Sequence, residues 1–143
     1  MPIDVIPGSS IIASGLNAER ARMEIVANNM ANANSTGATP YKRKIPVFEP
    51  AVNDSLADDS NPAAELAGVK IASVIQDNTP GEKIFSPFNP NADADGMIEM
   101  PNVSPITEMM DLITSTRAYE ANLTAMKQTY DMANKAVNLG KAS

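Results

Sequence analysis

The C-terminal quarter of the chain repeats side chains with the period of a coiled coil. From Met109 to Val137, mainly apolar residues recur at alternating spacings of three and four. Such a heptad places them along one seam of an α-helix, which another helix must cover. The seam consists of Met109, Leu112, Thr116, Tyr119, Leu123, Met126, Tyr130, Ala133 and Val137. We therefore expect one long C-terminal helix that packs against a partner.

A matching apolar seam lies near the N-terminus and predicts that the two ends of the chain pair in a helical bundle. Its positions are Ile12, Leu16, Met23, Val26, Met30 and Ala33. Ser9 or Ser10 can cap this first helix, and Gly37 and Pro40 stop it after an Asn-rich stretch. For the last helix we expect Ser104 as the cap, Pro105 at the first position and Gly140 at the end.

Between the helices, short β-type runs alternate with Pro, Gly and Asx residues. The candidate strands are residues 41–48, 69–76, 82–85 and 97–100, and Pro46 places the first of them at a sheet edge. We expect an exposed loop over residues 50–66. The predicted fold class is therefore mainly α with a small β insert, in which residues 1–37 and 104–143 form the helical core and residues 38–103 the insert.

Composition excludes several kinds of function. Residues 49–99 hold ten acids but only Lys70 and Lys83 as bases, and the net charge is -6, so a nucleic-acid partner is not expected. The chain has no Cys, so no disulfide, thiolate nucleophile or thiolate metal site is available, and no His, which removes the commonest general base and the commonest neutral metal ligand. We expect no cofactor, no metal and no small-molecule substrate. We also expect no membrane span and no classical secretion signal.

Two patterns of acidic residues can be interpreted either as a functional site or as part of the local structure. Residues 91–96 imitate the opening of a calcium loop, but Asn102 stands where a bidentate Glu should close the shell, so we interpret them as a turn leading into a strand. The pairs Asp58/Asp59 and Glu108/Asp111 could serve a carboxylate-dependent hydrolase. Glu108 and Asp111, however, lie near the start of a helix, where acids are favoured electrostatically.

Two helices cannot cover all of this apolar surface. Ile106, Met110 and Ile113 form a second row beside the main seam, and a chain this short offers nothing else to cover it. The pattern therefore favours a protein that packs against other chains. An adaptor or export chaperone that binds a client through these seams is the alternative, and it predicts a stable folded dimer in dilute solution.

Motifs along almost the whole chain resemble those of the flagellar axial proteins, the family of rod and hook subunits, and within it the proximal-rod proteins. Residues 28–37 are similar to the Asn-Asn-Leu-Ala-Asn motif of the family, with Met30 in place of Leu. Residues 89–103 and 117–122 are similar to blocks that separate the proximal-rod proteins from other rod subunits. The motif positions are Asn28, Asn29, Ala31, Asn32, Gly37, Pro101, Asn102, Val103, Arg117, Tyr119, Ala121 and Asn122.

The resemblance implies a structural subunit of the rod in the flagellar basal body, and not an enzyme. It implies export through the flagellar type III apparatus and assembly in the periplasmic space with other copies and other rod proteins, in order to transmit torque. The seam residues would be the packing residues, some within the helix pair and some between subunits. Asn29 and Asn32 are expected to hydrogen-bond the turn at the end of the first helix.

Overall fold

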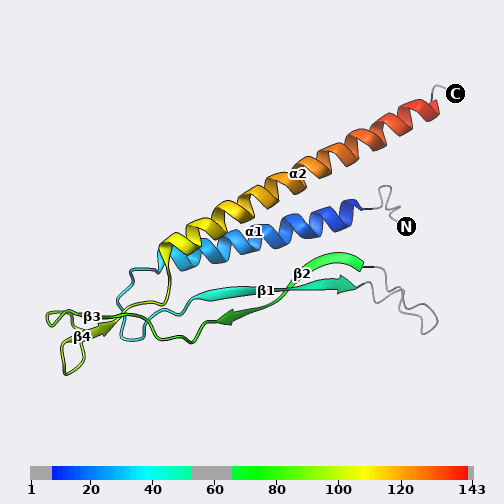
Figure 1. The fold of residues 1–143 in the computed structure, drawn as a ribbon. Helices are drawn as coiled ribbons and strands as arrows, with labels where there is room; N and C mark the ends of the chain where they lie inside the picture. The colour runs from blue at the N-terminus through cyan, green and yellow to red at the C-terminus, as the bar shows by residue number, and fades with distance from the viewer. Residues whose placement is uncertain (1–7, 53–65, 142–143) are drawn as a thin grey trace, which may run out of the picture.

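The computed structural model describes residues 8–52 and 66–141. Along the sequence, helix α1 (Ser9–Ala31) precedes four strands and helix α2 (Pro105–Lys141) follows them. The strands are β1 (Lys44–Val52), β2 (Leu66–Gln76), β3 (Lys83–Phe85) and β4 (Met97–Glu99). The predicted class, mainly α with a small β insert, is confirmed (Figure 1).

The helices pair in antiparallel fashion, and α1 lies between α2 and the β1–β2 sheet (Figure 1). Asn29, near the end of α1, contacts Glu108 near the start of α2, and Gly15 lies against Asn122. This register places Ser9 about two-thirds of the way along α2, so the last three turns or so of α2 extend beyond the described part of α1.

Each pair of strands forms its own two-stranded antiparallel sheet. In the β1–β2 sheet Lys44 pairs with Gln76, and an irregularity between Val47 and Phe48 shifts the register. Pro46 is accommodated because each strand of such a sheet has an open edge. In the second sheet Lys83 pairs with Glu99, which brings the short β3 beside the segment that leads into α2.

Several predicted boundaries move. The first strand begins at Lys44, three residues later than expected, because residues 41–43 are held by side-chain contacts described below. The prediction of a cap at Ser9 or Ser10 is wrong. Gly8 takes that position with φ 100°, and its carbonyl accepts a hydrogen bond from the amide of Ile12.

At the other end, Gly140 does not stop α2, which continues through Lys141. Ser104 does precede α2 as predicted, and its carbonyl accepts the first helical hydrogen bond from the amide of Glu108. Most of the loop expected over residues 50–66 lies outside the described residues, although β1 runs to Val52 and β2 starts at Leu66.

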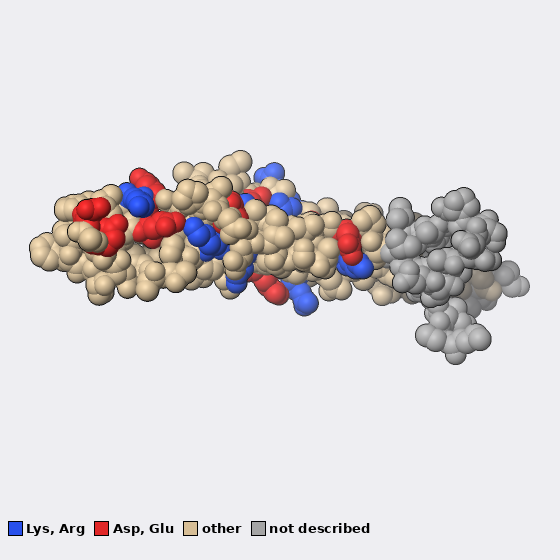
Figure 2. Space-filling view, turned by 90° about the horizontal axis from the view of Figure 1, so that it is seen from below, with Lys and Arg blue, Asp and Glu red and all other residues tan. Residues whose placement is uncertain are grey.

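The core is thin. Among the described residues the buried apolar side chains are those of Ala18, Val26, Ala33, Ile98, Pro101 and Val103, while Asn29, Glu108 and Ser115 are buried polar residues. The described acidic and basic side chains are interspersed along an elongated body (Figure 2). No helix within the described ranges is long and apolar enough to cross a bilayer.

Candidate functional site

A buried amide on α1 connects three elements of the fold. Asn29 is 1% exposed. Its Nδ2 donates to the Lys44 carbonyl (2.9 Å) and to Glu108 Oε2 (3.0 Å), and its Oδ1 accepts from the Lys44 amide (2.9 Å) and the Tyr41 hydroxyl (2.9 Å). All four hydrogen-bonding positions of the amide are therefore used. Because Lys44 begins β1, Asn29 ties the end of α1 to the first strand and to α2.

Glu108, the acid that receives this bond, is fully buried on α2. Its other oxygen accepts from Arg43 Nε at 2.6 Å. The same guanidinium donates to Asp111 (3.1 Å), and Asp111 also accepts from Arg22 of α1 (3.0 Å). Two arginines thus compensate two carboxylates that a helix interface would otherwise desolvate at high cost.

A second amide fastens the β insert to this cluster. Asn102 Oδ1 accepts from the backbone amide of Arg43 at 2.8 Å, and its Nδ2 donates to the Asp77 carbonyl (2.9 Å) and to Thr79 Oγ1 (3.0 Å). The segment before α2, the segment before β1 and the segment after β2 are held together by this one side chain. We call the set Arg22, Asn29, Tyr41, Arg43, Asn102, Glu108 and Asp111 the polar junction.

The end of α1 is closed by a neighbouring asparagine. Asn32 Nδ2 donates to the Asn28 carbonyl at 2.8 Å, which also accepts from the Asn32 backbone amide, so this side chain hydrogen-bonds the turn at the helix end as expected. The corresponding expectation for Asn29 is wrong, because its side chain points across to Lys44 and Glu108 instead. A single sequence cannot distinguish these two roles, since both residues lie in the same Asn-rich run.

The junction and the β insert shift the pKa of three groups. Partial burial and the nearby Glu108 charge raise the pKa of Tyr41. The pKa of Asp77 is lowered, mainly by a hydrogen bond from the Thr79 amide. The pKa of Glu99 is lowered by the Gly81 amide first and then by Lys42, whose Nζ lies 3.1 Å from it. Each shift favours the protonation state that holds the observed contact at neutral pH.

The Glu108/Asp111 pair and the calcium-like segment have structural roles, whereas Asp58 and Asp59 lie outside the described residues. Glu108 and Asp111 are committed to arginines and, for Glu108, to Asn29, so neither is presented to a substrate. Asp93, in the calcium-like segment, accepts hydrogen bonds from the amides of Asp95 and Met97, which forms a turn that leads into β4. Within residues 8–52 and 66–141, no three acidic side chains gather in a way that could hold a metal ion.

The structure divides the heptad seam of α2 between two environments. Leu112, Thr116, Tyr119, Met126 and Ala133 are partly buried, whereas Met109, Leu123, Tyr130 and Val137 are exposed. The line that faces α1 most closely runs through Glu108, Ser115 and Asn122. Small and polar residues thus share the helix contact with the partly buried half of the predicted seam, and Gly15 permits the close approach of Asn122.

On α1 the predicted packing residues Ile12, Leu16, Met23 and Met30 are partly buried and Val26 is buried. Met23 Sδ lies 3.6 Å from Thr116 Oγ1, which places this part of the seam against α2. The remaining motif positions fall into two groups. Pro101 and Val103 are buried in the segment that leads to α2, whereas Asn28, Ala31, Gly37, Arg117 and Ala121 are exposed.

A second row of α2 lies on the outer side of the helix. Ile106, Met109, Met110 and Ile113 are all at least half exposed, and Ile106 reaches 74%. With 3.6 residues per turn, Ile106, Met110 and Ile113 lie nearly opposite Glu108 and Ser115, which face α1. We call these four residues the outer ridge.

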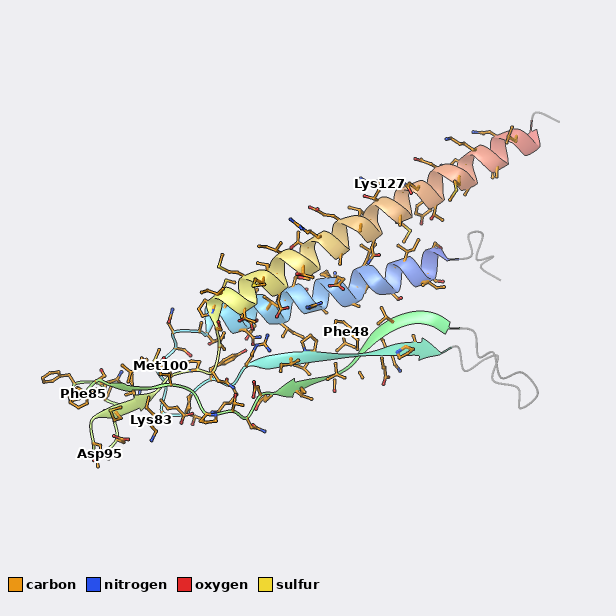
Figure 3. The ribbon with its side chains drawn as sticks, viewed as in Figure 1. Phe48, Lys83, Phe85, Asp95, Met100 and Lys127 are labelled. Carbon is orange, nitrogen blue, oxygen red and sulfur yellow. The ribbon has the colours of Figure 1, made fainter. Side chains whose placement is uncertain are left out.

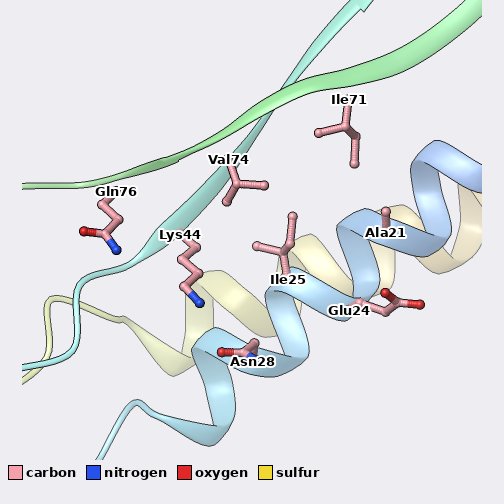
Figure 4. A pocket seen from close by; sticks show the side chains of 8 residues that line it. All are labelled: Ala21, Glu24, Ile25, Asn28, Lys44, Ile71, Val74 and Gln76. Carbon is pink, nitrogen blue, oxygen red and sulfur yellow. The ribbon is translucent and has the colours of Figure 1, made fainter.

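An apolar groove opens on the other side of α1, between this helix and β2, with a volume of about 510 Å³. Ala21 and Ile25 of α1 face Ile71 and Val74 of β2 across it, as Figure 4 shows. Glu24, Asn28, Lys44 and Gln76 complete the lining with polar groups. The chain therefore carries an apolar ridge and an apolar groove on separate faces.

The central residues of the junction are only partly visible in the sequence. Asn29 and Asn102 stand out as motif positions, but Arg43 is one of three consecutive bases and Glu108 is explained equally well by the helix dipole. The pairing of a base at position 43 with acids 65 and 68 residues later leaves no local signal.

Two family models match the chain, one near its N-terminus and one near its C-terminus. Residues 11–39 match the family model described as Flagella basal body rod protein, and residues 94–139 match the model described as Flagellar basal body rod FlgEFG protein C-terminal. The first segment contains Asn29 and the second contains Asn102, Glu108 and Asp111. The two matched segments are therefore those that the polar junction joins.

Whole-chain relatives agree with this result. The chain is 38% identical to the flagellar basal-body rod protein FlgC of Aquifex aeolicus, over 97% of this chain and 99% of that protein. It is 36% identical to the FlgC protein of Bacillus subtilis, over 92% and 95% of the two chains. It is 37% identical to the FlgC protein of Salmonella typhimurium, over 92% and 94%.

Proposed function

The chain belongs to the family of the flagellar basal-body rod protein FlgC, and from this membership we propose how it works as a structural subunit of the rod. The subunit is exported through the flagellar type III apparatus, joins other copies and other rod proteins in a helical assembly in the periplasmic space, and transmits torque. Its activity is mechanical, with no catalytic step, cofactor or small-molecule substrate. Residues 1–37 and 104–143 form the axial core, and residues 38–103 form the insert.

The observation that supports assembly most directly is the outer ridge. Four large apolar side chains within about two turns of α2 are at least half exposed, and Leu123, Tyr130 and Val137 of the heptad seam are exposed farther along the same helix. Contiguous apolar surface of this kind is typical of a protein interface. Contacts between different faces of identical subunits generate an open helix when the rotation between neighbours does not close a ring.

The polar junction supports a role in transmitting force. A twisting load on α2 reaches α1 through Asn29 and Arg22, and it reaches the β insert through Arg43 and Asn102. Charged and fully satisfied hydrogen bonds in a partly buried site hold a defined geometry better than apolar contacts alone. The helices and the insert would therefore turn as one body.

The thin core supports export in an unfolded state. Few apolar side chains are buried among the described residues, and the chain has no cysteine, so no disulfide resists unfolding. Contacts with neighbouring subunits would then supply the stability that the isolated chain lacks.

Deletion of the gene in its own bacterium, followed by cryo-electron tomography of basal bodies, tests this proposal. We expect truncated rods and no swimming, and restoration of both by a plasmid copy of the gene. Normal rods in the deletion strain would refute the function. A stable folded dimer of the purified chain in dilute solution would instead support an adaptor or chaperone.

A further inference from the structure

We propose that the outer ridge of one copy docks in the groove between α1 and β2 of a second copy. This inference rests on the proposed function and specifies one contact within it. The ridge consists of Ile106, Met109, Met110 and Ile113, and the groove is floored by Ala21, Ile25, Ile71 and Val74.

The spacing of the ridge fits a helix that docks in a groove. Its residues stand at positions i, i+3, i+4 and i+7 of α2, which is the anchor pattern of amphipathic helices bound in apolar grooves. Two of the four are methionines, whose flexible side chains adapt to an irregular surface. The ridge is also remote from α1, so a partner can approach it without disturbing the polar junction.

The groove offers a matching surface. Ile25 and Val74 point toward one another across it, and Ile71 points into the same space (Figure 4). The facing walls are apolar, whereas the polar side chains of Asn28, Lys44 and Gln76 lie toward one end of the groove and Glu24 lies near Ala21 (Figure 4). Apolar contact area flanked by polar groups is the usual anatomy of a protein interface.

Charge favours a second copy as the occupant. Arg117 follows Ile113 by one helical turn, so it extends the line of the ridge with an exposed cation. Glu24 in the groove lining is an exposed acid, and its contact with Arg20 on α1 is long, at 3.9 Å. When the ridge of one copy enters the groove of another, Arg117 can meet Glu24. The same chain thus supplies both complementary surfaces.

The size of the contact predicts when it forms. Four anchor residues are far fewer than the roughly 20 to 30 residues that each partner contributes to a stable interface. An isolated pair is therefore weak, and the contact forms only where neighbouring contacts in the rod hold the copies together. The purified chain is expected to remain monomeric at micromolar concentration.

Site-specific photocrosslinking in intact basal bodies tests the docking. The photoreactive residue p-benzoylphenylalanine replaces Met110, which is 65% exposed and contributes little to the fold. After illumination we expect an adduct with twice the 15.1 kDa mass of the chain, joined within residues 21–28 or 71–76 of the second copy. Lys127, which projects from the side of α2 away from α1 (Figure 3), is the matched control position and should not give this adduct.

Several outcomes would overturn the inference while leaving the proposed function intact. These are normal rods with no adduct at position 110, an adduct with a different rod protein, and an adduct with a segment outside the groove. The same groove adduct from position 127 would also overturn it, because the contact would then not depend on the ridge.

A charge exchange tests the partner assignment independently. Glu24→Arg and Arg117→Glu should each lower the yield of the position-110 adduct several-fold, and the two changes together should restore most of it. Neither residue belongs to the polar junction, so circular dichroism of the purified variants should match that of the parent chain. A double variant that is as defective as the worse single variant would overturn the pairing and the docking with it.

Discussion

Replacement of Asn29 by alanine should show how much of the fold depends on the polar junction. The change removes two hydrogen bonds to the backbone of Lys44, one to Glu108 and one to Tyr41. A buried polar group left without a partner costs about 1–3 kcal/mol, and water can reach part of Lys44 and Tyr41. We therefore expect a loss of about 2–4 kcal/mol in the free energy of unfolding.

That loss is large for this protein. Net stabilities of single domains are about 5–15 kcal/mol, and a thin core places the isolated chain below that range. A loss of about 2–4 kcal/mol raises the ratio of unfolded to folded chains about 30- to 700-fold. The ellipticity of the purified variant at 222 nm should fall in buffer and recover only at higher concentrations of trimethylamine N-oxide, which favours compact states.

Two variants provide the comparison. Asn28→Ala alters the neighbouring exposed residue, whose side-chain oxygen makes only long contacts to Tyr41 (3.3 Å) and Asn32 (3.4 Å), so its effect should stay within about 0.5 kcal/mol. Asn29→Asp keeps the size of the side chain but cannot donate to Glu108 and adds a like charge beside it, so it should be at least as damaging as alanine. If Asn29→Ala and Asn28→Ala shift the osmolyte midpoint equally, the junction does not stabilise the fold.

Three further variants or conditions test other parts of the structure. Leu123→Asp should leave the circular dichroism of the purified chain unchanged, because Leu123 is already partly exposed. The same variant should abolish swimming when it is the only copy of the protein in the cell. A swimming strain would show that this face of α2 stays open in the rod. Because the folded state raises the pKa of Tyr41, the stability that this shift contributes is complete below the unfolded value near 10 and is lost as the pH rises through the folded value. Absorbance at 295 nm should therefore show a tyrosine titration at high pH that is missing in a Tyr41→Phe variant. Gly81→Ala should disrupt the β3–β4 sheet and increase proteolysis there, because its new Cβ would overlap the backbone carbonyl of Met100. Gly140→Ala should be tolerated or slightly stabilising, because its new Cβ would meet nothing within 4 Å among the described residues beyond its chain neighbours and the nearby helix backbone. Equal protease resistance of the two variants would contradict the close approach of Gly81 to Met100.

The sequence was sufficient for features that depend on local pattern. Heptad spacing located α2, a second apolar series located α1, and Pro, Gly and Asx residues separated the four strands of the insert. Errors occurred at element ends, as at Gly8 and Gly140, where a residue's own preference competes with contacts made by the rest of the chain.

The sequence was not sufficient to orient α2. Its heptad predicted one apolar seam, yet the side toward α1 runs through Glu108, Ser115 and Asn122, and several seam residues face outward. Periodicity shows that two stripes of a helix differ in polarity, but it does not show which stripe a partner will cover. The presence of arginines at 22 and 43 makes burial of the acidic stripe possible, and their proximity to it arises only when the chain folds.

Sequence alone therefore determined the helical ends, the β insert, the acidic middle and the family, because each is encoded by residues close together in the chain. Tertiary structure alone decided that Asn29 joins α1, β1 and α2, that Arg43 neutralises Glu108, and that the outer ridge and the groove remain open. These features depend on distances between residues that are far apart in sequence, and such distances exist only once the helices and the strands have packed.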